Sequence, residues 1–325
     1  MVSAAVTEHQ KQWQSNQAPP DEQTHQAWEA LDRCITEEEV EQAIQQMHLC
    51  TAPGKDGIPN AFLIKCSAML PLLTSLYELC RTLETTPFSW KEGSTLPLHK
   101  KDDPSLPQNY RGITLLNTIG KLYARVLNNW LATYVDPHLA EEQAGFRDGR
   151  MCEDQLFILT DIIEKRIQLS QPLWVVFVDV RKAYDRVWRN GLWYKLAKMK
   201  VSPKMIRILQ EMYSEVRNSV QVDKTDSETY NINIGLKQGC IMSPVLFSIF
   251  INDLVEDMNR ECTGITVGAA RKLCNLLFAD DMSLLAASQA DMQQTLTNGA
   301  ENGGLVSMWT KQKQWLWQEP QLKPR

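Results

Sequence analysis

The chain has 325 residues, of which 43% are hydrophobic and 22% charged, and its formal net charge is −5 at pH 7. At roughly 150 residues per domain, this length and apolar content predict about two compact units with a sizeable core and exclude a mainly disordered chain. The acidic balance excludes a protein that coats nucleic acid through bulk charge, because such binding needs a broad excess of lysine and arginine.

Eight cysteines are scattered without a CxxC pair, which predicts buried free thiols in a reducing compartment. The first residues, MVSAAVTEHQKQW, lack the basic and apolar regions of a signal peptide, and no apolar run reaches about 18 residues. We therefore expect a soluble, intracellular protein with no membrane partner. The sequence does not distinguish nucleus from cytoplasm.

The first elements in chain order are helices. Residues 1–34 are rich in Gln, Ala, Pro and His without periodicity, so we expect a poorly ordered lead-in. Thr36 and Glu39 then form a capping box that predicts a helix over about 37–48. After a turn-rich APGKDGIPN segment, a second helical stretch is expected over about 60–84, interrupted near Pro71.

Two short apolar strands are predicted next, at Thr95 to Leu98 and Ile113 to Leu116, joined by a long loop. The loop carries three cations, Lys100, Lys101 and Arg111. Apolar periodicity then predicts helices over about 119–134, 153–168 and 203–217. Between the last two, the run PLWVVFVDV predicts a strand buried on both faces, with Asp179 near its end.

The remaining elements are a hairpin, a helix and a second hairpin. Ser219 to Val222 and Tyr230 to Ile234 form the first hairpin. Ser243, as the N-cap, and Pro244 open a helix that continues to about Met258. The run KLCNLLFADDMSLLAAS predicts the second hairpin, with two adjacent aspartates at its turn. Beyond Ser288 no clean periodicity remains.

Three carboxylates carry the chemical signal. If the strand of Asp179 neighbours the hairpin of Asp280 and Asp281, all three acids converge on one sheet edge. Like charges about 4 Å apart repel by roughly 4 kcal/mol at an effective dielectric of about 20, so divalent cations are needed to stabilise such a cluster. Two Mg²⁺ ions would suit an in-line phosphoryl displacement. The alternative interpretation of Asp280-Asp281 is a polar hairpin turn.

Six ordered motifs resemble the reverse transcriptase domain of non-LTR (LINE-type) retrotransposons: APGKDGIP, NYRGITLLNTIGKLYARVL, EEQAGFRDGR, FVDVRKAYDRV, GLKQGCIMSPVLFSIFINDL and LLFADD. The resemblance covers about residues 35–290. It implies an α+β fold with the fingers and palm of a right-hand polymerase, in which an antiparallel palm sheet is packed against helices.

The resemblance also implies residue roles. Asp179, Asp280 and Asp281 would be the catalytic, metal-binding acids, holding two Mg²⁺ ions or Mn²⁺ as a substitute. The carbonyl of Val180 would complete the metal site. Tyr184 would pack under the incoming sugar and select dNTP over NTP; the alternative is an aromatic that packs the turn after the strand.

Further roles concern the substrate and the template. Gln238 and Gly239 match a loop that approaches the nucleotide and template. Lys100 and Arg111 match fingers cations that bind the triphosphate; Lys101 is an alternative to Lys100, and a solvated loop is the alternative for both lysines. Arg147 resembles a family position near the template or the fingers–palm junction.

The resemblance predicts four regions: a lead-in over 1–34, fingers and fingers–palm helices over 35–170, the catalytic palm over 171–290, and a degenerate tail over 291–325. Gly304-Leu305 followed by Lys311 or Lys313 resembles the family's lysine segment. No primer grip or thumb is recognised, so we expect a chain truncated after the palm that holds a duplex through few phosphate contacts.

The implied function is RNA-directed DNA polymerase, a reverse transcriptase that transfers a nucleotide from dNTP to a primer 3′-hydroxyl by two-metal catalysis. Its partners would be an RNA template, a DNA primer and dNTP. One alternative is a catalytically inactive remnant that at most binds nucleic acid or a protein. An RNA-dependent RNA polymerase is disfavoured by Tyr184 at the position of the sugar gate.

Overall fold

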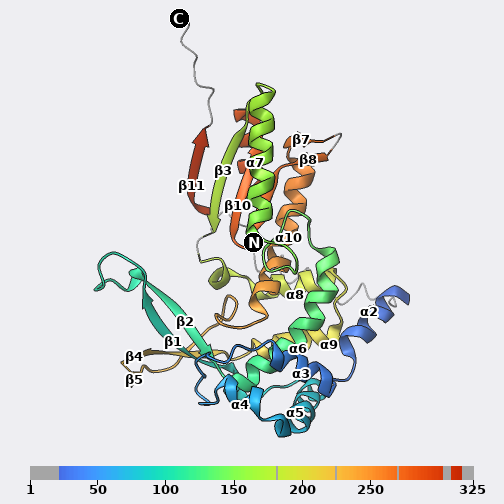
Figure 1. The fold of residues 1–325 in the computed structure, drawn as a ribbon, viewed down its shortest axis with the longest axis vertical. Coiled ribbons are helices and arrows are strands. Elements are labelled where there is room, and N and C mark those ends of the chain that lie inside the picture. The colour runs from blue at the N-terminus through green and yellow to red at the C-terminus, as the bar shows by residue number, and fades with distance from the viewer. Residues whose placement is uncertain (1–21, 181, 224, 269–270, 303–308, 317–325) are drawn as a thin grey trace, which may run out of the picture.

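The computed structural model describes residues 22–180, 182–223, 225–268, 271–302 and 309–316. These residues form a helical lower body with a projecting β-hairpin arm, and an upper sheet flanked by helices (Figure 1). The fold is therefore α+β, as the sequence predicted. A membrane-crossing helix is not found in the described part of the chain, since none of its helices is both long and apolar enough.

The N-terminal half builds the lower body. Its helices are α2 (Glu22–Asp32), α3 (Glu37–Gln45), α4 (Asn60–Lys65), α5 (Leu70–Leu83) and α6 (Thr118–Val135). The predicted capping box of Thr36 and Glu39 is present at the start of α3. The expected interruption lies at 66–69, and Pro71 occupies the first turn of α5.

Helix α2 contradicts the expected lead-in for residues 22–32. Its Trp28 indole donates a hydrogen bond to the Lys200 carbonyl (2.9 Å), and Leu31 is buried in the core. The helix is thus held by contacts with distant residues, which local composition does not reveal. Residues 1–21, the rest of the predicted lead-in, lie outside the described residues.

The arm is a sheet with strand order β2-β1-β4-β5, and β6 also pairs with β4. Its strands are β1 (Glu92–His99), β2 (Tyr110–Leu116), β4 (Arg217–Val222), β5 (Thr225–Asp226) and β6 (Tyr230–Asn231). The predicted pairing of Thr95–Leu98 with Ile113–Leu116 is confirmed. The second predicted pair is only partly right: β6 ends at Asn231 and pairs with Arg217 and Asn218, whereas Gln221 and Val222 pair with β5. The helix predicted over 203–217 was too long: α9 (Pro203–Met212) ends earlier, because residues from Arg217 onward pair in parallel with β1.

The upper sheet has strand order β11-β3-β10-β9, with every neighbouring pair antiparallel. Its strands are β3 (Trp174–Val180), β9 (Asn275–Phe278), β10 (Asp281–Ala286) and β11 (Trp309–Leu316). A separate small hairpin joins β7 (Ile265–Val267) to β8 (Arg271–Leu273). The acidic hairpin predicted from the sequence is therefore confirmed as β9–β10.

The prediction that β3 is buried on both faces was wrong. Val176, Val178 and Val180 are buried on one face, whereas Phe177 (40% exposed) and Asp179 alternate with them on the open face. Helix α7 (Cys152–Gln168) contributes Leu159 and Ile162 to a small apolar cluster with Leu285, at the other end of this face. At the acidic end, the Phe177 and Asp179 side chains stay exposed.

The longest helix is α10 (Ser243–Glu261), whose side chains are largely buried in the main core. Its cap residue is Met242, so the prediction of Ser243 as N-cap was wrong; the Ser243 hydroxyl instead donates to the Lys237 carbonyl (2.7 Å). Helix α8 (Arg189–Lys198) was missed by the sequence analysis.

Regular structure continues past Ser288, contrary to the expectation from periodicity. Helix α11 (Gln289–Asn302) packs on α10 and β10, and β11 pairs with β3. Backbone pairing places Lys311 opposite Asp179 and Lys313 opposite Phe177. Gly304-Leu305 of the predicted lysine segment lies outside the described residues.

Candidate active site

Strand register brings the three predicted aspartates to one end of the upper sheet. Asp281 is the first residue of β10 and lies directly opposite Asp179 of β3. Asp280 precedes it in the tight β9–β10 turn, where Ala279 has a φ of 62°. Two segments far apart in the sequence thus present three acids at the same sheet end.

The electrostatics of this end record the proximity of the acids. Partial burial raises the pKa of Asp281, and the carboxylates of Asp280 and Asp179 raise it further. Each nearby negative charge disfavours ionisation of its neighbour. A cation at this end would relieve that repulsion.

Carboxylate oxygens are the donors that hard divalent cations such as Mg²⁺ prefer. In the part of the chain that the structure describes, no three Asp, Glu, His or Cys side chains are drawn together into a ready metal cage. The three carboxylates therefore fit a divalent cation in their chemistry and in their shared place at the sheet end, although they are not gathered around one point.

Tyr184 lies directly after this strand, in the turn η5 (Tyr184–Arg186). Its ring stacks on Phe247 of α10, with centroids 5.1 Å apart and planes at 19°. Burial raises the pKa of the Tyr184 phenol well above its ordinary value, and the nearby Asp280 raises it further. The structure therefore places Tyr184 beside the acidic turn, with its ring stacked on Phe247, which the sequence analysis did not single out.

The Gln238-Gly239 loop is joined to the Tyr184 segment by backbone hydrogen bonds. The amide of Leu236 donates to the Tyr184 carbonyl (2.8 Å), and the amide of Gly235 donates to the Val187 carbonyl (3.0 Å). Gly239 has a φ of 77°, and a Cβ there would collide with the Thr114 carbonyl oxygen of β2. The loop thus bridges the upper sheet and the arm at a point where only glycine fits.

Arg189 and Tyr213 hold the start of this loop and were not found from the sequence. The Arg189 guanidinium donates to three carbonyls, those of Gly235 (2.8 Å), Tyr213 (2.9 Å) and Ile232 (3.0 Å). Both Arg189 and Lys237 place a cation over the Tyr213 ring. Burial lowers the pKa of Lys237 to about 8. Tyr213 was recognised only as part of the apolar side of the predicted helix over 203–217, and Arg189 and Lys237 were not singled out.

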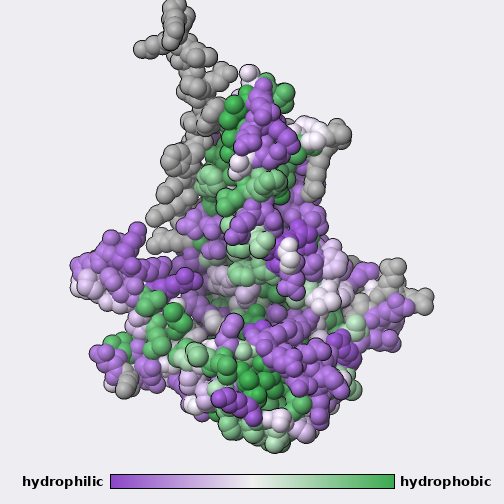
Figure 2. Space-filling model, in the orientation of Figure 1, coloured by the Kyte–Doolittle hydropathy of each residue, from purple (hydrophilic) through white to green (hydrophobic). Residues whose placement is uncertain are grey.

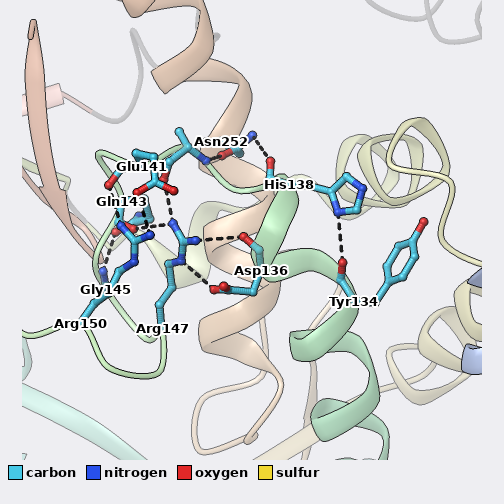
Figure 3. Close-up of polar contacts among 10 residues, drawn as sticks. Tyr134, Asp136, His138, Glu141, Gln143, Gly145, Arg147, Arg150 and Asn252 are labelled. Atoms are coloured by element: carbon cyan, nitrogen blue, oxygen red, sulfur yellow. Dashed lines mark hydrogen bonds and ion pairs between the residues drawn. The ribbon is translucent and has the colours of Figure 1, made fainter. Parts of the chain in front are cut away.

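Arg147 is buried within the loop that precedes α7, and Figure 3 shows its polar contacts there. Its guanidinium donates to the Asp136 carboxylate (2.7 Å) and to the carbonyls of Asp136 (2.9 Å), Ala140 (2.9 Å) and Gln143 (3.2 Å). All of these groups belong to its own loop. Arg147 therefore organises this loop, and its position near a template stays a prediction.

Lys100 and Arg111 lie on the β1–β2 hairpin, whose tip is strongly hydrophilic (Figures 1 and 2). Both residues are exposed, and Arg111 pairs across the hairpin with Leu98. Among the described residues, neither cation forms a hydrogen bond or ion pair with the three aspartates. The structure therefore leaves both on the arm and does not join them to the acidic end; their phosphate role stays a prediction.

The lower body with its arm and the upper sheet with its acidic turn correspond to the fingers and palm of a right-hand polymerase. The family model described as "Reverse transcriptase (RNA-dependent DNA polymerase)" matches residues 98–313, more than half of the chain. The chain belongs to this family, whose members are RNA-directed DNA polymerases. The match extends past residue 290, where the sequence analysis expected the resemblance to end.

Curated relatives come from non-LTR retrotransposons. The chain is 31% identical over 260 residues to "Probable RNA-directed DNA polymerase from transposon BS" of Drosophila melanogaster, covering 78% of this chain and 28% of the relative. It is 28% identical over 265 residues to "RNA-directed DNA polymerase from mobile element jockey" of the same species, covering 80% and 28%.

A third relative is "Retrovirus-related Pol polyprotein from type-1 retrotransposable element R2" of Popillia japonica. It is 29% identical over 271 residues, which cover 82% of this chain and 37% of the relative. The chain thus spans less than two fifths of the length of these relatives.

Proposed function

We propose that this chain is a reverse transcriptase domain that extends a DNA primer on an RNA template by transferring nucleotides from dNTP. The observation that carries the proposal is the pairing of Asp281 with Asp179 beside Asp280 at the open sheet end. Membership of the family supplies the reaction class.

Asp179, Asp280 and Asp281 would hold two Mg²⁺ ions, with Mn²⁺ as a substitute and the Val180 carbonyl as a further ligand. When bound, such ions activate a primer hydroxyl and neutralise charge on the transferred phosphate. The protein's own contribution is to keep three carboxylates close together against their mutual repulsion, which the raised pKa of Asp281 supports.

Substrate selection would depend on the residues around this end. Tyr184, stacked on Phe247, would form a floor under the sugar and leave no room for a 2′-hydroxyl. Gln238 and Gly239 would contact the nucleotide from the loop that bridges to β2. Lys100 and Arg111 would bind the triphosphate from the exposed arm, because guanidinium forks and ammonium groups pair well with phosphate. We also propose the fingers and palm divisions at about 35–170 and 171–290.

The test is primer extension on poly(rA)–oligo(dT) with Mg²⁺ or Mn²⁺. The parent chain is compared with an Asp280→Asn, Asp281→Asn double variant. The matched control is Asp102→Asn, Asp103→Asn, which removes the same charge from an exposed pair in the arm. Extension by the parent and the control, with none by the first variant, is the expected result.

Two outcomes would contradict the proposal. Equal extension by the Asp280, Asp281 double variant would place the metal site elsewhere. No extension by a folded parent would favour a non-catalytic chain, and its binding to RNA, to the duplex or to a protein would then be measured.

A further inference from the structure

The turn that carries the acidic pair has an unfavourable backbone. Ala279, immediately before Asp280, adopts a φ of 62°, in the left-handed region that residues with a side chain rarely occupy. Such a conformation is strained and persists only where the surroundings fix it. Some group must therefore hold this turn.

The side chain of Gln143 is that group. Its Oε1 accepts hydrogen bonds from the amides of Ala279 (3.2 Å) and Gly145 (2.9 Å), and its Nε2 donates to the Ala279 carbonyl (3.4 Å). Gln143 is fully buried, so water does not compete for these bonds. One carboxamide thus contacts both backbone polar groups of the residue that precedes Asp280.

The segment around Gln143 is itself fixed against β9. The amide of Ala144 donates to the Leu277 carbonyl (3.0 Å), and the amide of Leu277 donates to the Glu142 carbonyl (2.9 Å). A Cβ at Gly145 would collide with the Ala279 backbone, so the loop approaches the turn as closely as glycine allows. The loop thus runs beside β9 like a short additional strand.

Arg147 fixes the backbone of the Gln143 segment. It donates to the Gln143 carbonyl and to the carbonyl and carboxylate of Asp136 (Figure 3). Asn252 of α10 accepts from the Ala140 amide (2.8 Å) and fixes the same loop to the core helix. The position of the Gln143 side chain is therefore set before any substrate or metal binds.

We propose that Gln143 is a positioning residue for the Asp280-Asp281 turn. It acts through Ala279 and touches no substrate. A carboxamide is required because it both accepts from the Ala279 amide and donates to the Ala279 carbonyl. An ionised glutamate cannot donate, and it would add a fourth carboxylate near three others. Methionine has a similar length but forms neither hydrogen bond. This inference rests on the proposed polymerase function only in its Mn²⁺-binding and primer-extension measurements; hydrogen exchange tests it independently.

The main test compares Gln143→Met with a matched control, Gln168→Met, at an exposed position on α7. Hydrogen exchange is followed over residues 275–286, and Mn²⁺ binding is measured by electron paramagnetic resonance without nucleic acid. In Gln143→Met we expect faster exchange confined to this hairpin and a roughly tenfold weaker Mn²⁺ affinity. Primer extension should lose kcat by at least about tenfold, with KM for dNTP within threefold, since a turn misplaced by about 1 Å impairs chemistry more than binding.

Two results for Gln143→Met would overturn the proposal. One is a lower Tm with faster hydrogen exchange throughout the chain, which indicates a merely structural role. The other is unchanged hydrogen exchange with unchanged Mn²⁺ affinity. A measurement on the unmodified chain covers the case in which Gln143→Met does not fold. The Ala279 amide should exchange slowly because it donates a hydrogen bond to Gln143 Oε1, and exchange as fast as that of an open turn would refute the inference. If the parent shows no extension at all, the proposed function fails while both exchange measurements still decide the role of Gln143.

Discussion

A single methyl group at Gly239 should separate the placement of the nucleotide loop from the stability of the fold. Gly239 has a φ of 77°, and the Cβ of an alanine would lie well inside 3.0 Å of the Thr114 carbonyl oxygen. That oxygen belongs to a strand backbone and cannot rotate away. Gly239→Ala therefore has to move the loop itself.

The magnitude follows from two separate terms. The left-handed conformation costs an alanine about 1–2 kcal/mol, and relieving overpacking typically costs about 1–3 kcal/mol more. Gly149→Ala is the matched control, because Gly149 has a φ of 71° with nothing within 4 Å of an added Cβ. The control carries the conformational term alone, so the difference between the two variants isolates the collision.

Ordinary contact begins at 3.4 Å, so the loop of Gly239→Ala must shift by about 1 Å. A displacement of that size can cost about 100-fold in rate. Thermal unfolding should show an extra loss of about 1–3 kcal/mol relative to Gly149→Ala, and single-nucleotide extension should show kcat/KM for dNTP reduced about 100-fold. Equal stability of the two variants would refute the steric argument, and equal kcat/KM would refute the role of the loop in nucleotide binding.

Three further predictions concern stability, the loop and the sugar. Two hydrogen bonds from Arg81 lower the pKa of Glu78 to about 2 from 4.5, which adds stability above about pH 4.5 that is lost as the pH falls toward 2. Glu78→Gln should therefore lower the free energy of unfolding by about 1–2 kcal/mol at pH 7, allowing for the partial exposure of Glu78. Measured by urea unfolding, the difference in this free energy between parent and variant should shrink as the pH falls from 4.5 to 3. A constant difference would contradict the prediction. In Arg189→Lys, the lysine cannot donate to all three carbonyls at once. Hydrogen exchange of the Gly235 amide should therefore accelerate, while hydrogen exchange in the distant α3 stays unchanged; an unchanged rate at Gly235 would contradict the prediction. Tyr184→Ala should narrow the preference for dNTP over NTP at least tenfold in extension assays, and unchanged discrimination would exclude it as the sugar gate.

Local signals explain what the sequence predicted correctly. The capping box of Thr36 and Glu39 is satisfied within four residues, and the acidic hairpin is bounded by two apolar strands close in sequence. Period and turn chemistry decide such elements without knowledge of the rest of the fold. The three aspartates were found for the same reason, since each lies at the end of a recognisable strand.

Non-local pairing explains what was missed. The sequence predicts a helix up to about residue 217, yet α9 ends at Met212 and the predicted strand begins earlier, at Arg217, because β1 offers a parallel partner more than a hundred residues away. The alternating exposure of β3 was hidden by a continuous apolar run, in which the Phe177 side chain is 40% exposed. Gln143 lies within the EEQAGFRDGR motif, but its role gave no signal, because its partner Ala279 is 136 residues away.

Register connects these two levels. Successive side chains of a strand point to opposite faces, so a slip of one residue between β3 and β10 would move one partner of the Asp179 and Asp281 pair to the buried face. A carboxylate there would lack water and a counter-charge, and burial without them is costly. The valines at 176, 178 and 180 oppose the slip, because it would expose them together. The apolar pattern that builds the core therefore also fixes which acids share the open face, so the proposed chemistry and the stability of the sheet depend on the same alignment.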